Sequence, residues 1–224
     1  MVKQILYTGL DPSHFQARGS ITHIPLIRIV PRPLSDPCVQ QALQNFSAYT
    51  HIIITSRSTV LILEKHMYDF GLKKEAWSAK IHIAVGRGTA AQLKSSGICP
   101  AIIAKTETAE GVVEELKKIS LYQTFFFWPH SSQARPVLQT YLEQSGAPFH
   151  ACQLYDTVSC CPPDLNVASF DEIIFTSPST VDAFFNNFGR FPDEKIYACI
   201  GPVTQSRFDF RNRELGRTHR HQLP

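Results

Sequence analysis

Short apolar runs alternate along the chain with longer stretches in which apolar residues recur every three or four positions. The short runs have the length and the β-branched content of buried strands, and the longer stretches have the period of amphipathic helices. This alternation predicts an α/β fold built on parallel sheets. The expected strands span residues 4–7, 25–30, 51–55, 82–85, 101–104, 124–128, 149–155, 172–176 and 197–200. The expected helices span residues 37–46, 58–68, 88–95, 109–119, 132–145 and 179–188.

One segment of the pattern occurs twice. Residues 52–60 and 173–181 are identical at seven of nine positions, and both contain Thr-Ser-x-Ser-Thr-Val behind an apolar strand. Each copy is followed by a second apolar strand that ends in Gly-x-x-Thr, at residues 86–89 and 201–204. Two paired motifs in the same order predict an internal duplication, which would make two similar units.

The repeated hydroxyls are expected at the carboxyl ends of strands, where the chain turns into a helix. Ligands of open α/β sheets bind at this edge, and the free N–H groups of a helix N-terminus attract anions. The same hydroxyls are also ordinary helix caps, each contributing about 1 kcal/mol to its helix, and the two roles can coexist. The candidate anion-binding residues are Thr55, Ser56, Ser58, Gly86, Thr89, Thr176, Ser177, Ser179, Gly201 and Thr204.

Composition and charge exclude several other classes. The chain has 224 residues, 43% of them hydrophobic and 18% charged, which is typical of a soluble globular protein. Its apolar runs are too short to span a membrane, and its N-terminus has no signal-peptide pattern, so we expect a cytoplasmic protein that does not bind membranes. The net charge of +3 arises after residue 205, where five arginines meet two acidic residues. The body is therefore neutral, and we expect no nucleic-acid partner.

Known catalytic and metal-binding patterns are missing from the sequence. The six cysteines form no Cys-x-x-Cys pair, so no zinc site is expected. The sequence contains neither a phosphate-binding Gly-x-x-x-x-Gly-Lys-Ser nor a Gly-x-Gly-x-x-Gly loop, and His-Glu-x-x-His is also missing. We therefore expect no metal and no nucleotide cofactor.

Taken together, the repeated motifs resemble those of the uroporphyrinogen-III synthase family. The matching segments are Leu-Tyr-Asp-Thr at 154–157, Phe-Thr-Ser-Pro-Ser at 175–179 and Ile-Gly-Pro-Val-Thr at 200–204. The first copy matches at residues 54–58, 85–89 and 108–113, and the resemblance covers residues 4–206. It implies two flavodoxin-like parallel-sheet lobes joined by a two-stranded ladder, with a shared cleft between them.

In that arrangement the lobe boundaries follow from the ladder. Lobe one would comprise residues 1–32 and 153–224, including ladder strands at about 26–31 and 153–158. Lobe two would comprise residues 33–152.

The resemblance also implies an activity. The family's substrate is hydroxymethylbilane, a linear tetrapyrrole with eight carboxylates. A cofactor-independent lyase of this family removes its terminal hydroxyl and closes the macrocycle with inversion of ring D to uroporphyrinogen III. Tyr155 occupies the position of the family tyrosine that assists departure of the hydroxyl. The alternative reading of Tyr155 is a packed tyrosine at the hinge. The carboxylates would bind the repeated turns, and the protein would be a monomer.

The end of the chain departs from the family pattern. After Thr204 the family continues with a helix, a strand and a final helix, whereas residues 205–224 form a basic run without a clear apolar period. The sequence therefore predicts a lobe that lacks one βα unit, with an edge covered by a partner, or a tail that is lineage-specific or read from a shifted frame.

Two other functions stay open on the sequence. One is a non-catalytic, two-lobe polyanion-binding or regulatory protein derived from this fold. The other is a nucleic-acid-associated protein that acts through its arginine-rich tail.

Overall fold

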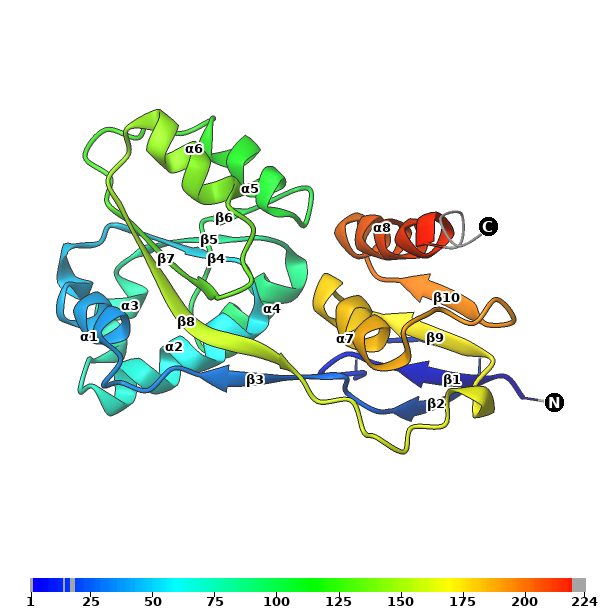
Figure 1. Cartoon of the computed structure of the whole chain (residues 1–224). Helices are drawn as coiled ribbons and strands as arrows, with labels where there is room; N and C mark the ends of the chain where they lie inside the picture. Colours follow the sequence, from blue (N-terminus) through cyan, green and yellow to red (C-terminus); the bar gives the residue numbers. More distant parts are fainter. Residues whose placement is uncertain (1, 14, 17–18, 219–224) are drawn as a thin grey trace. The chain divides into compact units, whose positions relative to one another are not determined.

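The computed structural model describes residues 2–13, 15–16 and 19–218 (Figure 1). The chain forms two compact units. The continuous unit is Ile29–Asp156, and the discontinuous unit combines Met1–Arg28 with Thr157–Pro224. The chain passes between the units along strands β3 (Ile27–Pro31) and β8 (Phe149–Ser159). These boundaries lie four residues from those expected at 32/33 and 152/153.

The sheet of the continuous unit has the strand order β3-β8-β7-β4-β5-β6. Its inner strands, β7 (Phe126–Ser131), β4 (His51–Ile54) and β5 (Ile81–Ala84), pair in parallel with their neighbours, including β6 (Ile102–Ile103). Main-chain hydrogen bonds join residue 32 to 154 and residue 160 to 26, so the β3–β8 pair runs antiparallel.

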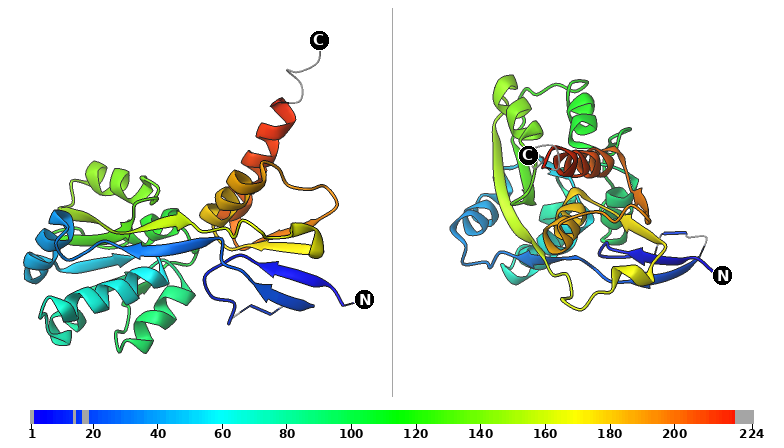
Figure 2. Two further views of the ribbon diagram at one scale, coloured as in Figure 1. Left: turned by 60° about the horizontal axis from the view of Figure 1, so that its bottom comes forward. Right: turned by 45° about the vertical axis from the view of Figure 1, so that its right-hand side comes forward.

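Helices cover both faces of this sheet (Figure 2). One hydrophobic cluster packs one face against α1 (Pro37–Gln44), α2 (Arg57–Asp69), α3 (Lys74–Ser78) and α4 (Arg87–Ser95). The other face packs against α5 (Ala109–Leu116) and α6 (Val137–Ser145). Strand β4 is apolar at successive positions because it is covered by helices on both faces of the sheet. Ile52 and Ile54 enter the first cluster and Ile53 enters the second, and all three are fully buried.

The discontinuous unit has a second parallel sheet, with the order β10-β9-β1-β2. Its strands are β1 (Gln4–Tyr7), β2 (Ser20–His23), β9 (Glu172–Phe175) and β10 (Ile196–Cys199). Helices α7 (Pro178–Phe188) and α8 (Pro202–Thr218) pack on this sheet around an aromatic cluster. The predicted α/β fold with parallel sheets is therefore confirmed in both units.

No helix was expected in the basic tail, yet residues 202–218 form helix α8. Among the described residues no strand follows β10, so the further βα unit expected to be missing is not seen there. Arg207 and Arg211 both bind the carboxylate of Asp182 on α7, at 2.8 and 2.7 Å from their Nε atoms. Phe208 packs its ring 4.6 Å from that of Phe191. The methylene groups of arginine can cover an apolar surface while the guanidinium groups pair with a carboxylate. Helix α8 can therefore pack on α7 without a regular apolar period. The rest of the tail lies outside the described residues.

Candidate functional site

The turn between β4 and α2 begins the candidate site of the continuous unit. Ser56 has an extended backbone and is the N-cap of α2, since its Oγ accepts a hydrogen bond from the Thr59 N–H at 3.1 Å. Ser177 is the N-cap of α7 in the same way, with Oγ 3.4 Å from the Thr180 N–H. Both copies of the repeat thus have the same local structure, and the capping role expected of these hydroxyls is present at each.

Tyr155, on strand β8, contacts the turn between β4 and α2. Its hydroxyl lies 2.8 Å from Ser56 Oγ, although 99 residues separate them in the chain. Only 5% of Tyr155 is exposed, so its ring is packed while its polar end has a hydroxyl partner. Because Ser56 Oγ also accepts the Thr59 N–H, the phenol is linked through one hydroxyl to the N-terminus of α2.

A carboxylate of the protein occupies the next turn, between β5 and α4. The N–H of Arg87, the first residue of α4, donates to Glu107 Oε1 at 3.0 Å, and the Arg87 Nε lies 3.5 Å from the same atom. Gly86 makes this approach possible, because a Cβ there would lie 2.5 Å from Glu107 Cγ. The register pairs Ile54 with Ala84, so the two turns share one edge of the sheet.

The turns of the discontinuous unit show the same pairing of strand ends, since Phe175 is in register with Cys199. Ser177 Oγ lies 2.8 Å from Ser179 Oγ. The chain after β1 approaches closely here, because a Cβ on Gly9 would lie 2.5 Å from Thr176 Oγ1. Gly201, with φ +85°, occupies the left-handed region directly before α8.

The predicted site residues differ in accessibility. Six hydroxyl residues are half-buried at the turns: Thr55, Ser56, Ser58, Thr176, Ser177 and Ser179. Thr89 and Thr204 are 5% and 3% exposed, within the first turns of α4 and α8. Ligand contact by any of these residues stays a prediction. Among the residues that the structure describes, no three His, Cys, Asp or Glu side chains gather as metal ligands.

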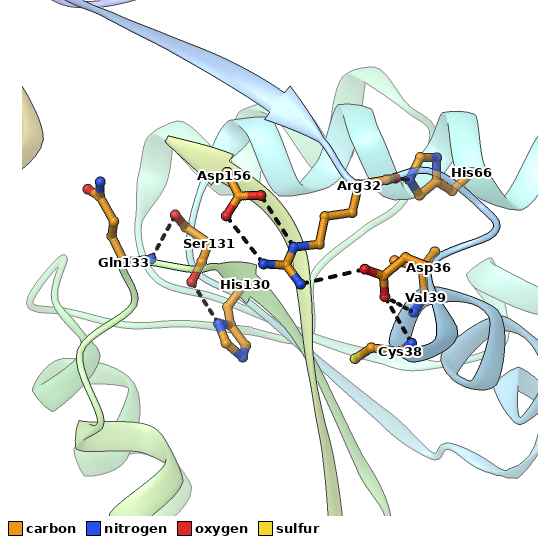
Figure 3. Close-up of polar contacts among 9 residues, drawn as sticks. All are labelled: Arg32, Asp36, Cys38, Val39, His66, His130, Ser131, Gln133 and Asp156. Carbon is orange, nitrogen blue, oxygen red and sulfur yellow. Dashed lines mark hydrogen bonds and ion pairs between the residues drawn. The ribbon is translucent and has the colours of Figure 1, made fainter. Parts of the chain in front are cut away.

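Sequence reasoning missed a charged group next to Tyr155 in the chain, the ion pair of Arg32 with Asp156, which Figure 3 shows. The Arg32 guanidinium lies between two carboxylates, 3.4 Å from each Asp156 oxygen and 3.5 Å from Asp36 Oδ2. A hydrogen bond from Ser132, together with Arg32, lowers the pKa of Asp156. Asp36 also caps α1 by accepting the N–H groups of its first turn. The only sequence signal was that Asp156 follows Tyr155, since nothing in the sequence reveals which residue pairs with it.

The family model described as "Uroporphyrinogen-III synthase HemD" matches residues 15–212. A protein of Methanothermobacter thermautotrophicus described as "Putative uroporphyrinogen-III synthase" is 28% identical over 172 residues, which are 68% of this chain and 66% of that protein. The fold is similar to that of a mutant uroporphyrinogen III synthase from Thermus thermophilus. That match has 16% identity and a TM-score of 0.64, and it covers 93% of this chain and 89% of the other. A uroporphyrinogen-III synthetase from Helicobacter pylori is similar as well, with 17% identity, a TM-score of 0.61, and coverage of 96% and 89%. No described helix is long and apolar enough to cross a bilayer.

Proposed function

The chain belongs to the uroporphyrinogen-III synthase family, and we propose that it cyclises hydroxymethylbilane to uroporphyrinogen III with inversion of ring D. The observation that carries the proposal is the Tyr155 hydroxyl at 2.8 Å from Ser56 Oγ, next to the N-terminus of α2. The reaction is a dehydration followed by carbon–carbon bond formation, so its atoms and electrons balance without a redox group. It therefore needs no cofactor.

In the proposed first step, the Tyr155 phenol is the general acid. The substrate C–O bond breaks, the hydroxyl leaves as water with the phenol proton, and a pyrrole nitrogen supplies the electron pair, which leaves a protonated azafulvene cation beside the phenolate. A phenol is protonated at neutral pH and can donate this proton. Ser56 would then donate a hydrogen bond to the phenolate, and the α2 N-terminus behind it favours the new negative charge.

We propose that the repeated turns bind substrate carboxylates. Glu107 supports this proposal, since its carboxylate already accepts the first N–H of α4 at 3.0 Å. The capping serines leave other N–H groups of the first helical turns available. The residues proposed for carboxylate binding are Thr55, Ser56, Ser58, Gly86, Thr89, Thr176, Ser177, Ser179, Gly201 and Thr204. We further propose that the two units arose by duplication, because Ser56 and Ser177 cap equivalent helices.

The test of the function is a product assay. The purified chain is incubated with enzymatically generated hydroxymethylbilane, and the oxidised uroporphyrin isomers are resolved by chromatography. We expect the inverted isomer III in excess over the enzyme-free reaction. Isomer I alone, at the rate of the enzyme-free control, would contradict the proposal. Calorimetric binding of the tetrapyrrole in that case would favour the non-catalytic polyanion-binding protein.

Tyr155→Phe is expected to lower kcat about tenfold without abolishing turnover, since water can partly replace the proton donor. The Phe ring keeps the packing of the 5% exposed side chain, so the stability should change little. Tyr122→Phe is the matched control, because Tyr122 is 79% exposed and should tolerate loss of its hydroxyl. Wild-type turnover in Tyr155→Phe would remove the assigned role.

Glu107→Gln is expected to lower KM by about two- to fivefold at unchanged kcat, because a substrate carboxylate no longer competes with a charged side chain. The glutamine oxygen can still accept the Arg87 N–H, so the helix start is preserved. Steady-state kinetics measure both constants. Glu114→Gln, which breaks the surface pair with Lys117, is the control and should leave KM unchanged. A raised KM in Glu107→Gln would show that this carboxylate does not compete with substrate.

A further inference from the structure

Tyr155 points toward Ser56 because strand β8 contains a bulge. The register of β7 and β8 pairs His130 with Gln153, and then Ser131 with Tyr155, so Leu154 is skipped. Successive residues of a regular strand face opposite sides of the sheet. Leu154 and Tyr155 are nevertheless both buried in the same hydrophobic cluster, at 1% and 5% exposure. The extra residue therefore turns Tyr155 to the face on which α2 lies.

The contacts of Arg32 and Asp156 hold this bulge on both sides of Tyr155. The Arg32 N–H donates to the Leu154 carbonyl at 3.0 Å, and its guanidinium pairs with Asp156. The Tyr155 carbonyl accepts the Ser132 N–H at 3.0 Å. The residues before and after Tyr155 are thus both bonded to Arg32, one by its main chain and one by its side chain.

Arg32 is itself fixed from two other elements (Figure 3). Its carbonyl accepts a hydrogen bond from His66 Nε2 on α2 at 2.8 Å, and its Nη1 lies 3.5 Å from Asp36 at the start of α1. Only 28% of the Arg32 side chain is exposed. These contacts connect the bulge to two helices of the same unit, including the helix that carries Ser56.

We propose that Arg32, through its ion pair with Asp156, is a positioning residue that holds the β8 bulge and thereby aims the Tyr155 hydroxyl at Ser56. This inference rests on the proposed role of Tyr155. The guanidinium is already paired with the carboxylates of Asp156 and Asp36, so Arg32 would orient the phenol through strand β8 and not by binding the substrate. The ion-pair distances of 3.4 Å exceed those of the strongest charge-assisted bonds, so the effect on turnover should be moderate.

The kinetic test removes the side-chain charge and keeps the main-chain N–H. Arg32→Gln is expected to lower kcat about tenfold and to leave KM within about twofold, whereas Arg32→Lys should retain most of the turnover. In a Tyr155→Phe background, Arg32→Gln should have no further effect on kcat, because a residue that acts through Tyr155 is coupled to it. Lys3→Gln, which breaks the Lys3–Glu172 pair of 2.7 Å, is the control and should leave kcat unchanged.

Two kinetic outcomes would overturn the proposal. Unchanged kcat in Arg32→Gln would show that the ion pair does not position Tyr155. A raised KM that persists in the Tyr155→Phe background would instead identify Arg32 as a direct ligand of a substrate carboxylate.

A spectroscopic readout separates this inference from the proposed function. The seven tyrosines can be replaced by 3-fluorotyrosine, and the ¹⁹F signal of Tyr155 is identified by its loss in Tyr155→Phe. Arg32→Gln should shift or broaden the Tyr155 signal while Tyr68 and Tyr122, both strongly exposed, keep theirs. This holds even if the chain forms no isomer III. An unmoved Tyr155 signal would overturn the positioning role whatever the activity.

Discussion

Phe175→Ala is expected to destabilise the discontinuous unit by about 3–5 kcal/mol, the usual loss when a buried Phe is truncated. Phe175 is fully buried at the end of β9 and contacts the rings of Phe184 and Phe191 at 5.4 and 6.0 Å. Tyr197 stacks nearly parallel to it. Because Thr176 and Ser177 follow directly, the cavity would also loosen the turn proposed to bind carboxylate.

The measurement must report on the discontinuous unit itself. Both tryptophans, Trp77 and Trp128, belong to the continuous unit, so their fluorescence does not follow the mutation directly. Amide hydrogen exchange of peptides from β9 and α7 reports on the discontinuous unit directly. A loss of about 3–5 kcal/mol in stability corresponds to exchange that is faster by a factor of about 100 or more. Phe127→Ala, at a fully buried position of β7, is the matched variant and should move the tryptophan transition. Unchanged exchange in β9 would show that Phe175 does not support this core.

Most of the fold was predictable because buried parallel strands leave a strong signal. The run at β4 is apolar on both faces and was located to within one residue. Strand β2 was missed for the opposite reason, since it lies at the sheet edge and three of its four residues are exposed. Helix α8 was missed because pairing of Arg207 and Arg211 with Asp182 replaces an apolar stripe.

The site was predictable only as far as local sequence determines it. The repeat located both capping serines, and the family resemblance that it suggested is confirmed by the family model. The contacts of Tyr155 with Ser56 and of Arg32 with Asp156 depend on strand register and on the β8 bulge. These contacts join residues 99 and 124 positions apart in the chain, so they depend on tertiary packing that no local motif reveals.

His82 should make the continuous unit sensitive to acid. Its ring lies in β5 at 1% exposure, its Nε2 has no hydrogen-bond partner among the described residues, and the Trp77 ring lies 6.0 Å away. Burial lowers the pKa of His82 to about 4, and a hydrogen bond with the Lys80 main chain only partly opposes this. The folded unit therefore holds a neutral imidazole at pH values where the unfolded chain binds a proton.

The difference in pKa between the folded and unfolded states fixes the pH range of the effect. Above the ordinary histidine pKa of about 6.5, His82 is neutral in both states and the stability is fully present. As the pH falls toward 4, only the unfolded chain is protonated at this ring. The difference between a pKa of about 6.5 in the unfolded chain and about 4 in the folded one lowers the free energy of unfolding by about 3 kcal/mol. Urea titrations followed by tryptophan fluorescence should show this loss between pH 6.5 and 4.

His82→Phe separates this contribution from that of the other histidines, because it keeps a ring in the core and removes the titrating group. The variant should lose most of the slope of stability against pH between 6.5 and 4, whatever its stability at pH 8. His51→Phe is the matched control. The pKa of His51, at the start of neighbouring β4, is also lowered by burial, but the side chain is 9% exposed and should account for less of the slope. An unchanged slope of stability against pH in His82→Phe would show that other groups cause the acid sensitivity. An equal loss of slope in His82→Phe and His51→Phe would show that both histidines contribute, and not His82 alone.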